Sequence, residues 1–109
     1  MNWIPLTSET QLEEIKNADS PALIFKHSTR CSISSAAKDR LERQWNDSKA
    51  EGLKAYYLDL LNYRPVSNKI ADDFGVEHQS PQVLLIKNGK SVYDTSHMAI
   101  GFDGIVSKL

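Results

Sequence analysis

The sequence predicts an α/β domain in which a mixed sheet has helices on both faces. The predicted elements follow the order strand, helix, strand, helix, strand, helix, strand, strand, helix. Helices that connect the early strands imply right-handed crossovers and parallel pairing, whereas Asn88-Gly89 is a type I′ turn signal that makes the last two strands antiparallel. At 109 residues the chain is large enough for one core, so we expect a single domain over residues 1–109.

A capping box marks the first predicted helix. Residues 3–6 read W-I-P-L and suit a short first strand. Ser8 followed three residues later by Gln11 is the pattern in which two side chains satisfy free N–H groups at a helix start. Leu12 and Ile15 then recur at helical spacing, so we expect them to form the buried face of this helix.

The second strand leads directly into the second helix. Residues 22–27 begin with the apolar run A-L-I-F after a turn that contains Pro21. The helix is expected to begin after Cys31 and to extend to about Ser48. Its buried face is predicted from apolar residues at every fourth position, namely Ile33, Ala37, Leu41 and Trp45.

Turn and cap signals divide the second half of the chain. Pro65 is expected at or near the first position of the third helix, where its missing N–H is harmless, and Gly75 is expected to end that helix. Asn88-Gly89 joins the two strands of a hairpin. The expected ranges are 54–60 for the third strand, 82–87 and 90–95 for the hairpin, and a last short helix that begins near Phe102 or Asp103.

Cys31 is the only cysteine and lies where the second strand gives way to the second helix. There its sulfur is expected to act as the N-cap and to accept hydrogen bonds from the backbone N–H groups of Ile33 and Ser34, which would favour thiolate over thiol. The Ser34 hydroxyl, one helical turn away, and the adjacent Arg30 guanidinium are candidates for stabilising the thiolate further. Cys31 and Ser34 are therefore the predicted catalytic residues.

These residues also have simpler interpretations. A lone cysteine in a cytosolic chain is more often a small buried hydrophobe, but the polar neighbours of Cys31 and its place outside the apolar stripe favour a reactive thiol. Ser34 can be an ordinary polar residue of the first helical turn, and Arg30 a solvated loop charge. His27 could hydrogen-bond near the site, but a histidine at a strand end is more often simply packed. Thr29 is expected to be a turn residue.

Composition and charge argue against several kinds of partner. A formal net charge of -1 with mixed signs does not suit a nucleic-acid or anionic-membrane surface. The sequence has no stretch apolar enough to cross a bilayer, and its N-terminus lacks the features of a signal peptide, so we expect a cytoplasmic protein. His78 and His97 show no ligand spacing, so no metal site is expected.

The segment 74–89, F-G-V-E-H-Q-S-P-Q-V-L-L-I-K-N-G, is similar to the thioredoxin stretch that ends a helix, passes through a cis-proline loop and enters a strand. Together with the element order, this resemblance implies a thioredoxin-like three-layer sandwich with a C-terminal hairpin and short helix. It also implies that Ser80-Pro81 is cis and that its loop faces Cys31. The Ser80 backbone would then be free to pair with an extended substrate.

Residues 26–34, K-H-S-T-R-C-S-I-S, resemble the active-site motif of the monothiol bacilliredoxins, which commonly reads K-H-S-x-x-C-P-I-S. The combined match runs from about residue 3 to residue 109. Ser32 stands where this family often has proline. Ser34 stands where thioredoxins have their resolving cysteine, so a two-cysteine mechanism is excluded.

The resemblance implies a thiol-disulfide oxidoreductase that acts on protein mixed disulfides in redox homeostasis and the stress response. Cys31 would attack the small-thiol sulfur, and a second small thiol or a separate reductase would then regenerate it. Bacillithiol would be the co-substrate and S-thiolated proteins the clients, with no bound cofactor. The predicted substrate-binding residues are Thr29, Arg30, Ser80 and Pro81.

Two other functions stay open at the level of sequence. A non-catalytic thioredoxin-fold module would use the Pro81 loop for protein contacts, with Cys31 incidental. An iron-sulfur cluster carrier would resemble the monothiol glutaredoxins, whose motif reads C-G-F-S. The corresponding C-S-I-S at residues 31–34 lacks the glycine, which ranks the cluster carrier below the other two functions.

Overall fold

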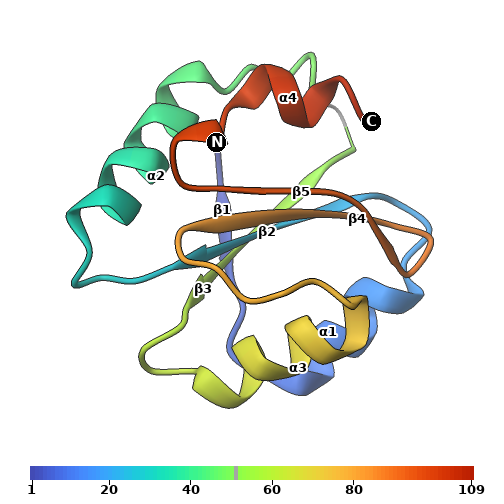
Figure 1. Cartoon of the computed structure of the whole chain (residues 1–109). Coiled ribbons are helices and arrows are strands. Elements are labelled where there is room, and N and C mark those ends of the chain that lie inside the picture. The colour runs from blue at the N-terminus through green and yellow to red at the C-terminus, as the bar shows by residue number, and fades with distance from the viewer. Residues whose placement is uncertain (51) are drawn as a thin grey trace.

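A five-stranded mixed sheet runs through the middle of the protein (Figure 1). The computed structural model describes residues 1–50 and 52–109. The strand order is β1-β3-β2-β4-β5; β1 and β2 run parallel to β3, β4 runs antiparallel to β2, and β5 runs antiparallel to β4. The strands span Trp3–Pro5 (β1), Ala22–His27 (β2), Lys54–Asp59 (β3), Gln82–Lys87 (β4) and Lys90–Ser96 (β5).

Helices cover both faces of this sheet, as predicted. Figure 1 shows α1 and α3 together on one face and α2 and α4 on the other. Their bounds are Glu9–Asn17 (α1), Ser32–Gln44 (α2), Arg64–Phe74 (α3) and Phe102–Val106 (α4), and a 3₁₀ turn, η1, spans His97–Ala99. Within the described ranges, no helix combines the length and apolar character needed to cross a bilayer.

Two hydrophobic clusters lie on either side of β2, whose residues are all buried. Ile24 packs in the cluster under α1 and α3, whereas Phe25 packs in the cluster under α2 and α4. Because successive side chains of a strand point to opposite faces, Lys26 faces α3 and His27 faces α2. The polar end of β2 therefore contributes one side chain to each layer of the molecule.

The predicted start of α1, the end of α3 and the hairpin turn are confirmed. The Ser8 hydroxyl accepts a hydrogen bond from the Gln11 backbone N–H at 3.2 Å. Gly75 ends α3 in the left-handed region, with a φ of 64°. Asn88 and Gly89 both have positive φ values, 54° and 77°, as a type I′ hairpin turn requires.

Two predictions about α2 are wrong. The helix ends at Gln44 rather than near Ser48, because the Asn46 side chain accepts hydrogen bonds from the backbone N–H groups of Ser48 and Lys49 and so favours a turn. The buried face also begins one residue later than predicted, at Ser34. Ile33 is 52% exposed, since the helix turns Ser34, Ala37 and Leu41 toward the core.

Candidate active site

Three loops meet at one end of the sheet, on the left of Figure 1. β2 and β3 are parallel and end side by side, with His27 paired to Asp59 and the Leu60 N–H bonded to the His27 carbonyl at 3.0 Å. β4 is antiparallel to β2 and begins at Gln82, opposite Lys26. The loop that carries Cys31, the β3–α3 loop and the loop that carries Ser80-Pro81 therefore lie together.

Cys31 is the N-cap residue of α2, as predicted, and is partly buried. Its backbone N–H bonds to the Ser28 carbonyl at 3.1 Å, and its own carbonyl accepts the Ser35 N–H at 3.1 Å. Within residues 1–50 and 52–109, however, its sulfur accepts no capping hydrogen bond, so that part of the prediction is wrong.

The Ser34 hydroxyl is fully buried and has two partners. It lies 2.6 Å from His27 Nδ1 and accepts a hydrogen bond from the Ser28 N–H at 3.2 Å. Neither partner is Cys31, so the predicted Ser34–sulfur hydrogen bond is absent from the described residues. The position of Ser34 at the first turn of α2 matches the prediction, but its side-chain partner is His27, for which the sequence favoured packing over a hydrogen bond near the site.

The His27 ring lies among charges of both signs. Burial lowers the pKa of His27, the Lys38 ammonium lowers it further, and the Asp59 carboxylate opposes them. The ring contacts Phe25 and Tyr57 at centroid distances of 5.9 and 5.3 Å. His27 is therefore mostly neutral at neutral pH.

Thr29 and Arg30, two of the predicted substrate-binding residues, line one cavity. Its volume is about 320 Å³, and its other wall is formed by Leu61 and Asn62 from the β3–α3 loop. Thr29 and Arg30 directly precede Cys31, so this cavity is lined by the loop that carries Cys31. Leu61 and Asn62 were missed from the sequence because only the sheet brings their loop next to the Cys31 loop.

The Ser80-Pro81 bond is cis, which confirms the expectation drawn from the thioredoxin resemblance. Pro81 is buried, and its carbonyl accepts the His97 N–H at 3.0 Å. The Ser80 hydroxyl oxygen is buried and has no hydrogen-bond partner in the part of the chain that the structure describes. Pairing of the Ser80 backbone with a substrate stays a prediction.

A buried lysine lies behind the proline loop. Lys26 is 0% exposed, and its ammonium bonds to the Ser67 carbonyl at 3.2 Å and lies 3.4 Å from His78 Nδ1. Burial lowers the pKa of Lys26 to about 8. The pKa of His78 is lowered by burial first and then by Lys26 and Arg64. This cluster joins β2, α3 and the segment before Ser80.

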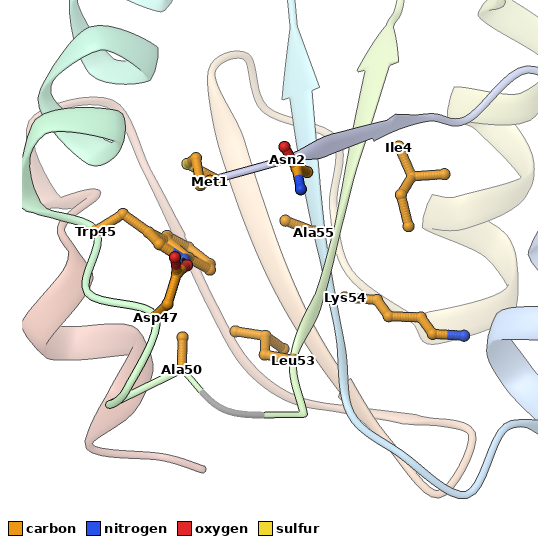
Figure 2. A pocket seen from close by; sticks show the side chains of 9 residues that line it. All are labelled: Met1, Asn2, Ile4, Trp45, Asp47, Ala50, Leu53, Lys54 and Ala55. Atoms are coloured by element: carbon orange, nitrogen blue, oxygen red, sulfur yellow. The ribbon is translucent and has the colours of Figure 1, made fainter.

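Another cavity, of about 260 Å³, lies far from Cys31. Figure 2 shows Met1, Asn2 and Ile4, from the N-terminus and β1, on one side of it and the segment after α2 on the other, where Trp45 Nε1 bonds to Asp47 at 3.0 Å. It borders the amino end of β3, whereas Cys31 lies near the carboxyl end. Among the residues described, no group of three or more His, Cys, Asp and Glu side chains could hold a metal.

The fold and the site define a class: thioredoxin-fold proteins with one cysteine at the start of α2 and a cis-proline before β4. The chain is similar to thioredoxin from Trypanosoma brucei brucei, at 14% identity and a TM-score of 0.78, over 98% of this chain and 87% of that one. It is also similar to oxidised thioredoxin from Plasmodium falciparum, at 14% identity and a TM-score of 0.75, over 98% and 97%. These similarities confirm the thioredoxin fold.

A third solved structure, described as an oxidoreductase candidate with a thioredoxin fold, is 28% identical to this chain with a TM-score of 0.84. The alignment covers 96% of this chain and 91% of that one. The sequence profile of the family described as monothiol bacilliredoxin BrxC matches residues 4–105. The chain therefore belongs to the monothiol bacilliredoxin family, and its fold and family support a thiol redox role.

Proposed function

We propose that this protein is a monothiol oxidoreductase that removes bacillithiol from S-thiolated proteins. The observation that carries the proposal is the placement of Cys31, the only cysteine, at the N-cap of α2 and at the sheet end where the cis-proline loop enters β4. A helix N-terminus favours an anionic sulfur, and Cys31 is only partly buried.

The reaction proceeds by two thiol-disulfide exchanges. The Cys31 thiolate attacks the bacillithiol sulfur of the mixed disulfide; the old S–S bond breaks, and the client thiolate leaves and takes up a proton. Cys31 is then disulfide-bonded to bacillithiol. A second thiolate, from free bacillithiol or a separate reductase, attacks that bacillithiol sulfur and releases Cys31 as thiolate. The client is reduced and the second thiol is oxidised, so the electrons balance.

The cavity beside Cys31 suits an anionic small thiol. Arg30 offers a planar guanidinium that pairs with carboxylates in two parallel hydrogen bonds, and Thr29 and Asn62 supply further polar groups. In the proposal, the carboxylates of bacillithiol occupy this cavity while the client polypeptide lies extended along Ser80-Pro81. The two substrates thus approach Cys31 from different loops.

The proposed compartment is the cytoplasm. A single cysteine that is recycled by external thiols needs surroundings in which small thiols are kept reduced. Secreted proteins, in contrast, use their cysteines mainly in permanent disulfide pairs. The chain has one cysteine and therefore no partner for such a pair.

Intact-mass spectrometry after incubation with oxidised bacillithiol tests the proposal. We expect one bacillithiol adduct on the protein, loss of that adduct on addition of free bacillithiol, and no adduct on Cys31→Ser, whose fold is retained because the change is nearly isosteric. Cys31→Ser should also have no activity toward a bacillithiolated client. An unmodified wild-type protein would instead favour the non-catalytic binding module, and activity that survives Cys31→Ser would refute the mechanism.

A further inference from the structure

A buried pair, His27 and Ser34, lies next to Cys31 and takes no part in the exchange steps above. His27 Nδ1 and Ser34 Oγ are 2.6 Å apart, and the two residues are 5% and 0% exposed. A serine hydroxyl has one proton to donate and two lone pairs that accept. The Ser28 N–H occupies one lone pair at 3.2 Å, so only the second lone pair and the proton are left for His27 and Cys31.

The protonation of His27 decides where the Ser34 proton points. When Nδ1 carries no proton, the Ser34 hydroxyl must donate to it, so Ser34 can then only accept a hydrogen bond from the thiol, through its second lone pair. When Nδ1 is protonated, it donates to the second lone pair of Ser34, and the hydroxyl proton becomes free to bond to Cys31. The direction of one hydrogen bond therefore links the imidazole to the sulfur.

Ser34 is within reach of the sulfur by its place in the helix. Cys31 is the N-cap and Ser34 the third helical residue, the same two positions as Ser8 and Gln11 in α1. Side chains at the N-cap and at the third helical position lie over the same first turn, as the capping-box pair of α1 also shows. In the inference, a change of the Cys31 side-chain rotamer brings its sulfur to the Ser34 hydroxyl.

We propose that His27 is a positioning residue which, through Ser34, takes up the Cys31 proton when the thiolate forms and returns it when the thiol is restored. In the forward step the thiol proton passes to Ser34 Oγ while the Ser34 hydroxyl proton passes to His27 Nδ1. The products are a thiolate, a hydroxyl that now donates to it, and an imidazolium, so every proton is accounted for. The inference rests on the proposed function, because it needs Cys31 to be the nucleophile.

The groups around His27 suit this exchange. On β3, Asp59 is its register partner and shares its face of the sheet, and Asp59 Oδ1 is buried without a hydrogen-bond partner among the residues described. That carboxylate stabilises an imidazolium, whereas burial and the Lys38 ammonium of α2 favour a neutral resting ring. In the inference, the neutral ring is the tautomer with its proton on Nε2, in which Nδ1 is free to accept the proton. Tyr57, the other titratable group against the ring, stays neutral because burial raises its pKa.

The test is the pH dependence of Cys31 alkylation by iodoacetamide in wild type, Ser34→Ala and His27→Asn. Asparagine keeps an acceptor for the Ser34 hydroxyl but cannot take up a proton. We expect both variants to move the midpoint upward by about one pH unit, which is about tenfold slower alkylation below the midpoint. Because His27 acts on the sulfur only through Ser34, the variant with both substitutions should shift the alkylation midpoint no further than either single variant. The exposed His97, replaced by Asn, should leave the midpoint unchanged.

A second measurement avoids any change to the pair itself. The His27 ring is titrated by NMR in wild type and in Cys31→Ser, which removes the thiolate and keeps the volume. We expect the His27 midpoint to fall in Cys31→Ser, because the imidazolium loses its anionic partner. An unchanged His27 midpoint would overturn the inference. It would also be overturned if Ser34→Ala shifted the midpoint of Cys31 alkylation and His27→Asn did not. If instead the wild-type protein formed no bacillithiol adduct, the proposed function would fail first.

Discussion

Replacing Lys26 with methionine should stabilise the protein at neutral pH relative to alkaline pH. The Lys26 ammonium is fully buried, and its contacts are the Ser67 carbonyl at 3.2 Å and His78 Nδ1 at 3.4 Å. Burial lowers the pKa of Lys26 from 10.5 to about 8. The folded state therefore holds this proton less tightly than the unfolded chain does.

The sign and size of the effect follow from this difference in pKa. Between about pH 8 and 10.5 the unfolded chain keeps a proton on Lys26 that the folded chain has lost. The contribution of Lys26 to the free energy of unfolding therefore rises with pH in this range. Below about pH 8 both states are protonated and the full penalty of burying the charge is present. A shift of about 2.5 units corresponds to about 3 kcal/mol at neutral pH, of which about 2 kcal/mol is relieved by pH 9.5.

Urea unfolding of wild type and Lys26→Met at pH 7 and pH 9.5 measures this effect. The change in their stability difference between the two pH values should be about 2 kcal/mol, in favour of wild type at the higher pH. Tyrosine and cysteine titrations are common to both proteins and cancel in this comparison. Lys54→Met, at an exposed position on β3, is the control and should show no such change. If the free energies of unfolding of wild type and Lys26→Met differed by the same amount at both pH values, the reasoning would be refuted.

Two further substitutions test the cavity and the end of α3. Arg30→Gln should slow reduction of oxidised glutathione, an anionic disulfide, several-fold more than reduction of the uncharged bis(2-hydroxyethyl) disulfide, because only the former needs the guanidinium. Equal kcat/KM losses for the two disulfides would remove Arg30 from the binding site. Gly75→Ala should cost about 1 kcal/mol in urea unfolding, because Gly75 has a φ of 64° and alanine adopts left-handed backbone only with strain. Since a Cβ there would meet no atom within 4 Å, a much larger loss would contradict a purely conformational cause.

Most of the fold could be predicted because its elements carry local signals at their ends. β2 and β4 begin and end at the predicted residues, since turn residues bound each apolar run. The hairpin turn at Asn88-Gly89 and the end of α3 at Gly75 follow from backbone angles that few residues adopt readily. The C-terminal end of α2 was missed because an Asn46 side chain, rather than an apolar pattern, decides it.

From the residues alone, the site could be predicted only where parts of it are neighbours in the sequence; the place of the Ser80-Pro81 loop came from the thioredoxin resemblance. Cys31 follows β2 closely, so its place at the helix start could be derived from the sequence. The Leu61–Asn62 wall belongs to a loop that is adjacent only in the folded sheet. β2 is buried on both faces, so its residues show no alternation from which the directions of Lys26 and His27 could be inferred.

The polar end of β2 makes sense when its two side chains are considered together. Lys26 reaches α3 and the segment before the cis-proline loop, whereas His27 reaches Ser34 at the start of α2. Lys26 therefore connects the end of β2 to α3 and the segment before Ser80, and His27 connects it to the start of α2. Two apolar residues would fill the same space without a buried charge, so stability alone does not account for this pair. The contacts of Lys26 with Ser67 and with His78, in the segment before Ser80, accompany a buried charge that destabilises the folded state, which is why replacement of Lys26 should raise stability at neutral pH.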